Sequence, residues 1–103
     1  MNRESLQGRV AVVTGASSGI GAAVAEALAR EGVHVALAAR RRDALLEVQA
    51  GLDDRGGEVR SLTVPTDVTD RGQVKSLVAR TEEELGPIHA LVNCAGIMYY
   101  TLV

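Results

Sequence analysis

The stretch VVTGASSGIGAAVAEAL, residues 12–28, joins an apolar run to an alanine-rich segment through a turn that holds three glycines. The run before the turn is rich in valine, which favours an extended strand. After the turn, apolar side chains recur every three or four residues, as in a helix that buries one face. The sequence therefore predicts a strand, a glycine turn and a helix in direct succession.

The same alternation continues along the chain. Short segments rich in β-branched residues, bounded by Gly, Pro or Asp, lie at residues 9–14, 33–39, 58–64 and 88–93 and predict strands. The segments between them have helical periodicity. Their expected inward faces are Ile20, Val24, Ala27 and Leu28 in the first helix, Leu45, Val48 and Leu52 in the second, and Val74, Leu77, Val78, Thr81 and Leu85 in the third.

Residues suited to helix ends agree with this division. Asp43 can open the second helix, and Thr69 or Asp70 the third, because short polar side chains accept hydrogen bonds from the first amides of a helix. Gly32 and Gly86 follow the first and third helices, where glycine commonly ends a helix.

The order β-α-β-α-β-α-β predicts the α/β class, as a Rossmann-type doubly wound parallel sheet truncated after the fourth strand. The length of 103 residues allows one domain. Because sheets of this type usually continue for at least two more strands, we expect residues 1–103 to form a partial domain. The fourth strand would then have an exposed apolar edge through which the chain could associate with another chain.

Composition excludes several classes of function. Apolar residues make up 47% of the chain, charged residues 23%, and the net charge is −2, which is ordinary for a soluble globular protein and disfavours nucleic-acid binding. The polar amino-terminal segment does not resemble a signal peptide, and no apolar run approaches the about 20 residues of a membrane span. The single cysteine, Cys94, can form no internal disulfide, which indicates a cytoplasmic location. Without Phe or Trp, the core must consist of Val, Leu, Ile and Ala.

The glycine turn is the strongest functional feature. Its glycines, Gly15, Gly19 and Gly21, have the spacing GxxxGxG rather than the GxGxxG of the general dinucleotide fingerprint. The physical requirements of that fingerprint can still be met: Gly15 lets the chain leave the strand, Gly19 lets the backbone approach a pyrophosphate, and Gly21 lets the helix pack closely on the sheet. A glycine-rich turn without a ligand is the alternative. A nucleoside-triphosphate loop is disfavoured because no Gly-Lys-Ser/Thr sequence follows.

Several groups at this turn are expected to face an anion. Free amides near Ser18, Gly19 and Ile20 and the hydroxyls of Ser17 and Ser18 would lie at the positive end of the following helix. The field of the helix end contributes about 0.3 to 1 kcal/mol at an exposed site, so most of the affinity must come from hydrogen bonds and from the rest of the ligand.

Three motifs together resemble those of the short-chain dehydrogenase/reductases. The sequence TGASSGIG at residues 14–21 resembles the family's cofactor motif TGxxxGxG. The sequence TDVTD at residues 66–70 resembles the acidic DV pair after the third strand, and LVNCAG at residues 91–96 resembles the NNAG motif after the fourth. The resemblance covers essentially the whole chain and implies the amino-terminal, NAD(P)-binding part of a family member.

The end of the second strand bears on the choice between the two cofactors. An acidic residue there favours the 2′-hydroxyl of NAD, whereas a nearby arginine favours the 2′-phosphate of NADP. Here Ala39 takes the position of the acid and Arg40 follows it, so NADP is the predicted cofactor and NAD the less favoured one. Arg41 is a further candidate. The alternative is that Arg40, Arg41 and Arg42 form a solvated charged loop, and for Arg42 this interpretation is preferred.

The resemblance also implies roles for residues after the third and fourth strands. Asp67 would accept a hydrogen bond from the adenine amino group beside Val68, and Asn93, Ala95 and Gly96 would line the crevice between the first and fourth strands. Without the resemblance, Asp67 would be interpreted as a turn residue.

Cys94 departs from the family pattern, which often has Asn there, and is expected to be an inert core thiol. His34 and His89 lie in predicted strands without a second ligand at metal-binding spacing, so no metal site is predicted.

The predicted cofactor-binding residues are Gly15, Ser17, Ser18, Gly19, Ile20, Gly21, Arg40, Arg41, Asp67, Val68, Asn93, Ala95 and Gly96.

The resemblance implies an enzyme that transfers hydride, but no catalytic residue is predicted within this sequence. The family uses an Asn, a Ser and a Tyr followed four residues later by Lys, all beyond the fourth strand. Tyr99 and Tyr100 do not fit, because Val103 stands four residues after Tyr99 and no residue stands four after Tyr100. Both tyrosines are expected in a loop after the fourth strand. Three hypotheses follow: a part of an NADP-dependent dehydrogenase or reductase, a stand-alone dinucleotide-binding module, or an interaction domain of the same fold without a ligand.

Overall fold

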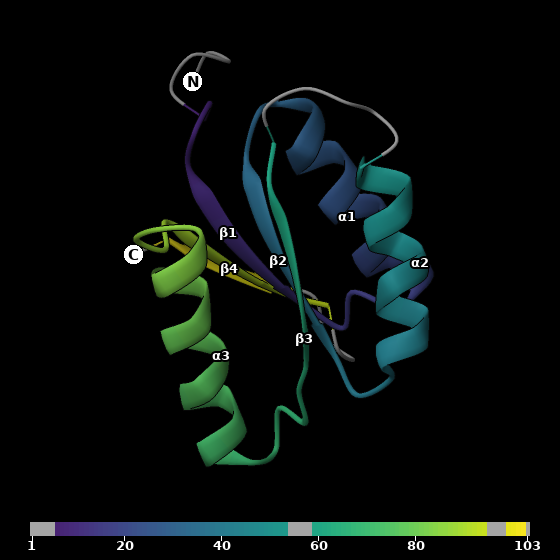
Figure 1. The fold of residues 1–103 in the computed structure, drawn as a ribbon, viewed down its shortest axis with the longest axis vertical. Helices are drawn as coiled ribbons and strands as arrows, with labels where there is room; N and C mark the ends of the chain where they lie inside the picture. The colour runs from purple at the N-terminus through teal and green to yellow at the C-terminus, as the bar shows by residue number, and fades with distance from the viewer. Residues whose placement is uncertain (1–5, 54–58, 95–98, 103) are drawn as a thin grey trace.

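The computed structural model describes residues 6–53, 59–94 and 99–102. Strands and helices alternate as predicted, and a further strand follows them (Figure 1). The elements are β1 (Val10–Thr14), α1 (Gly19–Arg30), β2 (His34–Ala39), α2 (Arg42–Asp53), β3 (Ser61–Pro65), α3 (Arg71–Glu84), β4 (Ala90–Asn93) and β5 (Tyr99–Leu102).

The strands form one sheet in the order β3-β2-β1-β4-β5. The first four strands along the chain are mutually parallel, so each βα crossover returns the chain to the same end of the sheet. The α/β class and the doubly wound parallel sheet are thereby confirmed. Strand order reverses between β2 and β4, on either side of β1, and the carboxyl ends beside such a reversal are where α/β sheets bind ligands.

The fifth strand corrects two expectations. Tyr99 and Tyr100 lie in β5 rather than in a loop, and β5 pairs antiparallel with β4, with Tyr99 opposite Asn93. The edge of β4 that was expected to be exposed is therefore paired, and association through that edge is not available while β5 occupies it. An antiparallel strand can follow β4 after a short connection, whereas a parallel strand would need a long crossover.

Two apolar layers lie on opposite faces of the sheet. Helices α1 and α2 cover one face and α3 covers the other (Figure 1). Successive strand residues point to opposite faces, so Val13 and Leu37 pack beneath α1 and α2, whereas Val12 and Ala38 pack toward α3. The apolar core consists of Val, Leu and Ala together with Cys94, and Ile88 is partly buried against it.

The inward face of α1 differs from the prediction. Gly21, Ala25 and Ala29 are its buried residues, whereas Ile20 is 61% exposed. Val24 and Leu28 flank this stripe and are partly buried. Three small residues at intervals of four allow the helix axis to lie close to the sheet. The buried face of α1 is therefore centred about 100° around the helix from a face centred on Ile20. In α2, Leu45 and Leu52 are buried as predicted.

The helix ends are set by local hydrogen bonds. Ser18 caps α1, and Asp70 rather than Thr69 caps α3 through Gln73 N at 3.2 Å. Asp43 lies inside the first turn of α2, which begins at Arg42, so Asp43 is not the N-cap that was expected. Gly32 and Gly86 follow α1 and α3 with φ of 84° and 118°, in the left-handed region that favours glycine.

Cys94 and the two histidines were assigned no functional role from the sequence. Cys94 is a buried free thiol, and burial raises its pKa. The Nδ1 atoms of His34 and His89 accept backbone amides from Arg60 at 2.9 Å and from Val10 at 3.4 Å. No cluster of metal-ligating side chains occurs within the described segments. None of the helices described is both long and apolar enough to traverse a bilayer.

Candidate dinucleotide-binding site

The glycine turn between β1 and α1 is closed by hydrogen bonds to a single carbonyl. Gly15 has φ of 66°, which lets the chain turn sharply after β1. Its carbonyl accepts from the amide of Ser18 at 3.1 Å and from the Ser18 hydroxyl at 2.8 Å. The same hydroxyl oxygen accepts the amide of Gly21 at 3.0 Å. Ser18 therefore holds the turn together, and the expectation that its amide is free is wrong.

Gly21 and Gly19 differ in the space available for a side chain. A Cβ at Gly21 would overlap the carbonyl oxygen of Gly15 and lie 2.8 Å from its carbonyl carbon and 2.9 Å from Cα of Ala16. A Cβ at Gly19 would meet no atom within 4 Å. Gly21 is thus needed for contact between the helix and the turn, whereas Gly19 keeps open space at the mouth of the turn.

Some of the first amides of α1 are hydrogen-bonded to Ser18, and others face the open space beside Gly19. Ser18 accepts the amide of Gly21 through Oγ and the amide of Ala22 through its carbonyl at 2.8 Å. The amides of Gly19 and Ile20 come before these and, at the start of a helix, have no intrahelical acceptor. They lie at the positive end of the helix dipole beside the glycine that lacks a side chain. This arrangement suits the oxygens of a phosphate group.

A cavity of about 380 Å³ adjoins the turn at the carboxyl ends of the strands. Five of its lining residues are predicted cofactor residues. The cavity is lined by Gly15, Ser17, Ala39, Arg40, Arg41, Thr66 and Val68. Three separate segments of sequence, after β1, β2 and β3, therefore meet around one space. Thr66 is a lining residue that was not singled out from the sequence, although it lies in the TDVTD motif.

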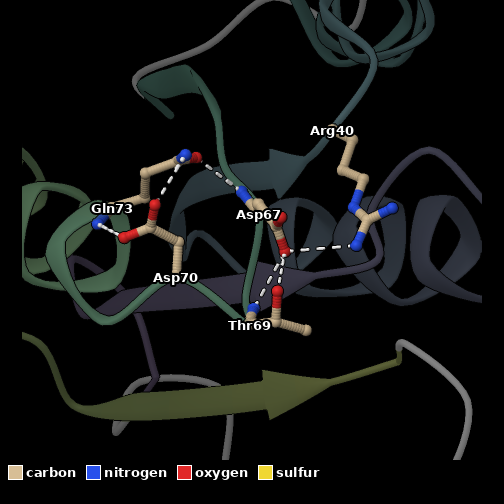
Figure 2. Close-up of polar contacts among 5 residues, drawn as sticks. All are labelled: Arg40, Asp67, Thr69, Asp70 and Gln73. Carbon is tan, nitrogen blue, oxygen red and sulfur yellow. Dashed lines mark hydrogen bonds and ion pairs between the residues drawn. The ribbon is translucent and has the colours of Figure 1, made fainter.

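Arg40 and Asp67 form an ion pair across the ends of β2 and β3 (Figure 2). Nη2 of Arg40 lies 3.2 Å from Oδ1 of Asp67, with 71% of the Arg40 side chain and 33% of the Asp67 side chain exposed. The two chain segments are joined beside this pair by a backbone hydrogen bond of 2.7 Å from the amide of Thr66 to the carbonyl of Ala39. Arg41 contacts Asp43 at 3.5 Å instead, and both side chains are largely exposed.

The carboxylate of Asp67 is fixed mainly by Thr69. Its Oδ1 accepts the Thr69 hydroxyl at 2.6 Å and the Thr69 amide at 2.9 Å, and these bonds, with a smaller contribution from Arg40, lower the pKa of Asp67. The amide of Asp67 donates to Oε1 of Gln73 at 2.8 Å, and Gln73 in turn bonds Asp70 (Figure 2). Asp67 is therefore an ionised, well-anchored group at the end of β3.

Thr14 and Asn93 join the ends of β1 and β4. They are paired in register, and Oγ1 of Thr14 donates to Oδ1 of Asn93 at 3.0 Å. Asn93 therefore lies beside the first residue of the glycine motif, at the predicted crevice. Ala95 and Gly96 lie outside the described residues. The role of Thr14 was not singled out from the sequence, and its position directly before Gly15 was the available signal.

A larger cavity, of about 510 Å³, lies between α3 and the sheet. It is lined mainly by apolar side chains, among them Val68, Val78 and Leu91, and includes Thr14 and Asn93 at its polar end. It contains neither arginine nor any residue of the glycine turn after Thr14. The smaller cavity is therefore the one with the chemistry to bind phosphate.

Comparison with known proteins agrees with this geometry. Residues 9–102 match the sequence profile described as short chain dehydrogenase. The chain is 62% identical over 98 residues to glycine betaine reductase ATRR of Emericella nidulans, covering 95% of this chain and 8% of that protein. It is 39% identical over 98 residues to 2,3-dihydro-2,3-dihydroxybenzoate dehydrogenase of Bacillus subtilis, covering 95% of this chain and 37% of that enzyme.

A solved structure shows the same likeness in three dimensions. The L-sorbose reductase of Gluconobacter frateurii, determined in complex with NADPH and L-sorbose, superposes with a TM-score of 0.81 at 44% identity, over 88% of this chain and 34% of that one. The chain spans between 8% and 39% of the length of the curated relatives it matches. The chain therefore belongs to the short chain dehydrogenase family and corresponds to the NAD(P)-binding region of these oxidoreductases.

Proposed function

We propose that the chain binds NADP(H) and serves as the cofactor-binding part of an enzyme that transfers hydride between NADP(H) and a carbonyl or alcohol substrate. The supporting observation is the cavity at the ends of β1, β2 and β3, in which Arg40 and Arg41 lie beside the glycine turn and the neutral Ala39. Arginine can hold a phosphate through two parallel hydrogen bonds, and Ala39 brings no carboxylate that would repel it.

In this proposal the pyrophosphate lies over the start of α1. The amides of Gly19 and Ile20 donate to it, with the hydroxyl of Ser17 at the cavity wall. Gly15 and Gly21 shape the turn, and Ser18 contributes by holding it closed. The 2′-phosphate lies against Arg40 and Arg41.

The rest of the cofactor extends along the carboxyl ends of the strands. Asp67 accepts the adenine amino group and Val68 lies beside the ring, while Asn93, with Ala95 and Gly96, lines the crevice between β1 and β4. When bound, NADP(H) supplies or accepts the hydride. The residues of this chain bind and orient it.

Titration of NADPH and NADH, followed by the fluorescence of the reduced nicotinamide, tests the proposal. We expect saturable binding of both, with the tighter binding for NADPH and a lower NADPH affinity in Arg40→Ala. Arg42→Ala is the matched control, since Arg42 is outside the residues that line the cavity. If neither NADPH nor NADH saturates the chain below millimolar concentration, the proposal is rejected and an interaction domain without a ligand is favoured.

A second measurement separates the cofactor-binding part from an enzyme complete in itself. Neither of the two tyrosines is followed four residues later by Lys. We therefore expect no turnover when the 103-residue chain is assayed for NADPH oxidation against a panel of carbonyl compounds. Specific turnover would show that this chain holds catalytic groups of another kind.

A further inference from the structure

The ion pair between Arg40 and Asp67 places an acidic group against the arginine that the proposed function assigns to the 2′-phosphate. Arg40 lines the cavity, whereas Asp67 does not. The guanidinium of this lining residue is bonded through Nη2 to the Asp67 carboxylate at 3.2 Å (Figure 2). A phosphate entering the cavity meets a cation that already has a counter-charge.

The three donors to Oδ1 of Asp67 are held at different distances. The Thr69 hydroxyl at 2.6 Å and the Thr69 amide at 2.9 Å are closer than Arg40 at 3.2 Å. The two Thr69 bonds close a turn within three residues of chain, whereas the Arg40 bond joins residues 27 apart. Arg40 is thus the partner that can leave while the carboxylate stays in place.

We propose that Asp67 is a specificity-determining residue that lowers the preference for NADP over NAD, by competing with the 2′-phosphate for Arg40. This inference rests on the proposed function, in which Arg40 meets the 2′-phosphate. A phosphate monoester carries a charge of about −1.5 to −2 at neutral pH, so its binding depends on the net charge at Arg40. The 2′-hydroxyl of NAD is neutral, and its binding does not.

The size of the effect follows from exposure. The Arg40 side chain is 71% exposed and that of Asp67 33%, so solvent screens the pair. Exposed ion pairs of this kind are weak, and we expect removal of the acidic charge to raise the NADPH to NADH affinity ratio by about two- to fivefold. Any effect of the substitution on the adenine contact is common to NADPH and NADH, so the ratio of the two affinities is the quantity that reports on Arg40.

The substitution Asp67→Asn tests the charge without removing the acceptor. The Asn side-chain oxygen can still accept from Thr69 and from an adenine amino group, so the turn and any adenine contact are retained. The matched control is Asp70→Asn, which makes the same charge change near the site at a residue that bonds Gln73 rather than Arg40. Asn is as good a helix cap as Asp, so α3 should be unaffected.

The experiment measures NADPH and NADH dissociation constants, at one ionic strength, for the wild type, Asp67→Asn, Asp70→Asn, Arg40→Ala and the double variant Arg40→Ala/Asp67→Asn. We expect the NADPH to NADH affinity ratio to rise in Asp67→Asn, to stay unchanged in Asp70→Asn, and to show no effect of Asp67→Asn once Arg40 is absent. That non-additivity distinguishes action through Arg40 from a direct effect on the nucleotide.

Two kinds of failure are separable. An unchanged or lowered ratio in Asp67→Asn, or the same rise in the Arg40→Ala background, overturns the inference while leaving NADP binding intact. Failure of the wild type to bind either nucleotide overturns the proposed function and the inference with it. An unchanged NADPH affinity in Arg40→Ala overturns the inference alone, because Arg41 also lines the cavity and would then hold the 2′-phosphate.

Discussion

Gly21 on α1 lies directly against the carbonyl group of Gly15, so that a side chain at position 21 would occupy the space of the turn's own backbone. Backbone on both sides of the contact cannot rotate away as a flexible side chain could. Gly21→Ala should therefore lower the free energy of unfolding by about 1–3 kcal/mol or more, because the helix must move off the turn. Urea unfolding followed by circular dichroism measures this change.

Gly19→Ala is the matched control for that substitution, two residues away in the same turn. Its new Cβ would meet no atom within 4 Å, so we expect the free energy of unfolding to be retained. The methyl group would instead stand in the space assigned to the pyrophosphate, and NADPH affinity should fall. Wild-type nucleotide affinity in Gly19→Ala would place the phosphate elsewhere.

The combined substitution Ala39→Asp and Arg40→Ala should shift cofactor preference toward NAD. The new carboxylate can accept a ribose hydroxyl and repels a phosphate, while loss of the guanidinium removes a charge-assisted contact of about 1.5–3 kcal/mol. We expect the NADPH to NADH affinity ratio to fall by about tenfold or more. An unchanged ratio would mean that another arginine, such as Arg41, reads the phosphate.

His34 should make the fold sensitive to mild acid. Burial, and then the charge of Arg60, lower its pKa below the ordinary 6.5, and its Nδ1 accepts the Arg60 amide, which a protonated ring cannot do. The stabilisation is therefore fully present above pH 6.5, where both folded and unfolded states are neutral, and declines as pH falls from 6.5 through the lower folded value.

The variant His34→Asn checks this assignment, because its Oδ1 can accept a hydrogen bond but does not titrate. Thermal unfolding between pH 5 and 7.5 should show a smaller loss of stability in the variant than in the wild type. Equal pH profiles for the two chains would assign the acid sensitivity to other groups.

Thr14→Val should destabilise the junction of β1 and β4. Valine keeps the shape of threonine but removes the hydroxyl that donates to Oδ1 of Asn93 at 3.0 Å, with only 6% of Thr14 exposed. We expect a loss of about 1 kcal/mol in the free energy of unfolding. Ser17→Ala is the control: Ser17 is exposed in the same turn, and its loss should change stability by less than about 0.5 kcal/mol. Equal effects of the two substitutions would contradict the assignment.

The sequence was a good guide to the fold where the pattern is local. Alternation of β-branched runs with helical periodicity correctly predicted four parallel strands and three helices, and the short polar residue Asp70 was one of two candidates that marked the start of α3. The β5 strand was missed because a four-residue segment at Tyr99–Leu102 carries little information of its own, and its pairing with β4 depends on a partner elsewhere in the sheet.

The candidate site was predicted in its composition but not in its contacts. The motif correctly included Ser18 and Ile20, but not what they contact. The amide and hydroxyl of Ser18 donate to the Gly15 carbonyl, and the Ile20 side chain is exposed rather than packed in the core. Periodicity fixes which residues share a helix face. It does not say how far the helix is rotated on the sheet, which here follows from the small residues Gly21, Ala25 and Ala29.

The sequence by itself determined the family, the order of strands and helices, and the residue types that a dinucleotide site needs, because these depend on local periodicity and on motifs within a few residues. Only the tertiary structure decided that Arg40 meets Asp67, a residue 27 positions away, and that Thr14 bonds Asn93. Those contacts arise where parallel strands end side by side, and strand order, rather than any property of the individual segments, decides which strand ends become neighbours.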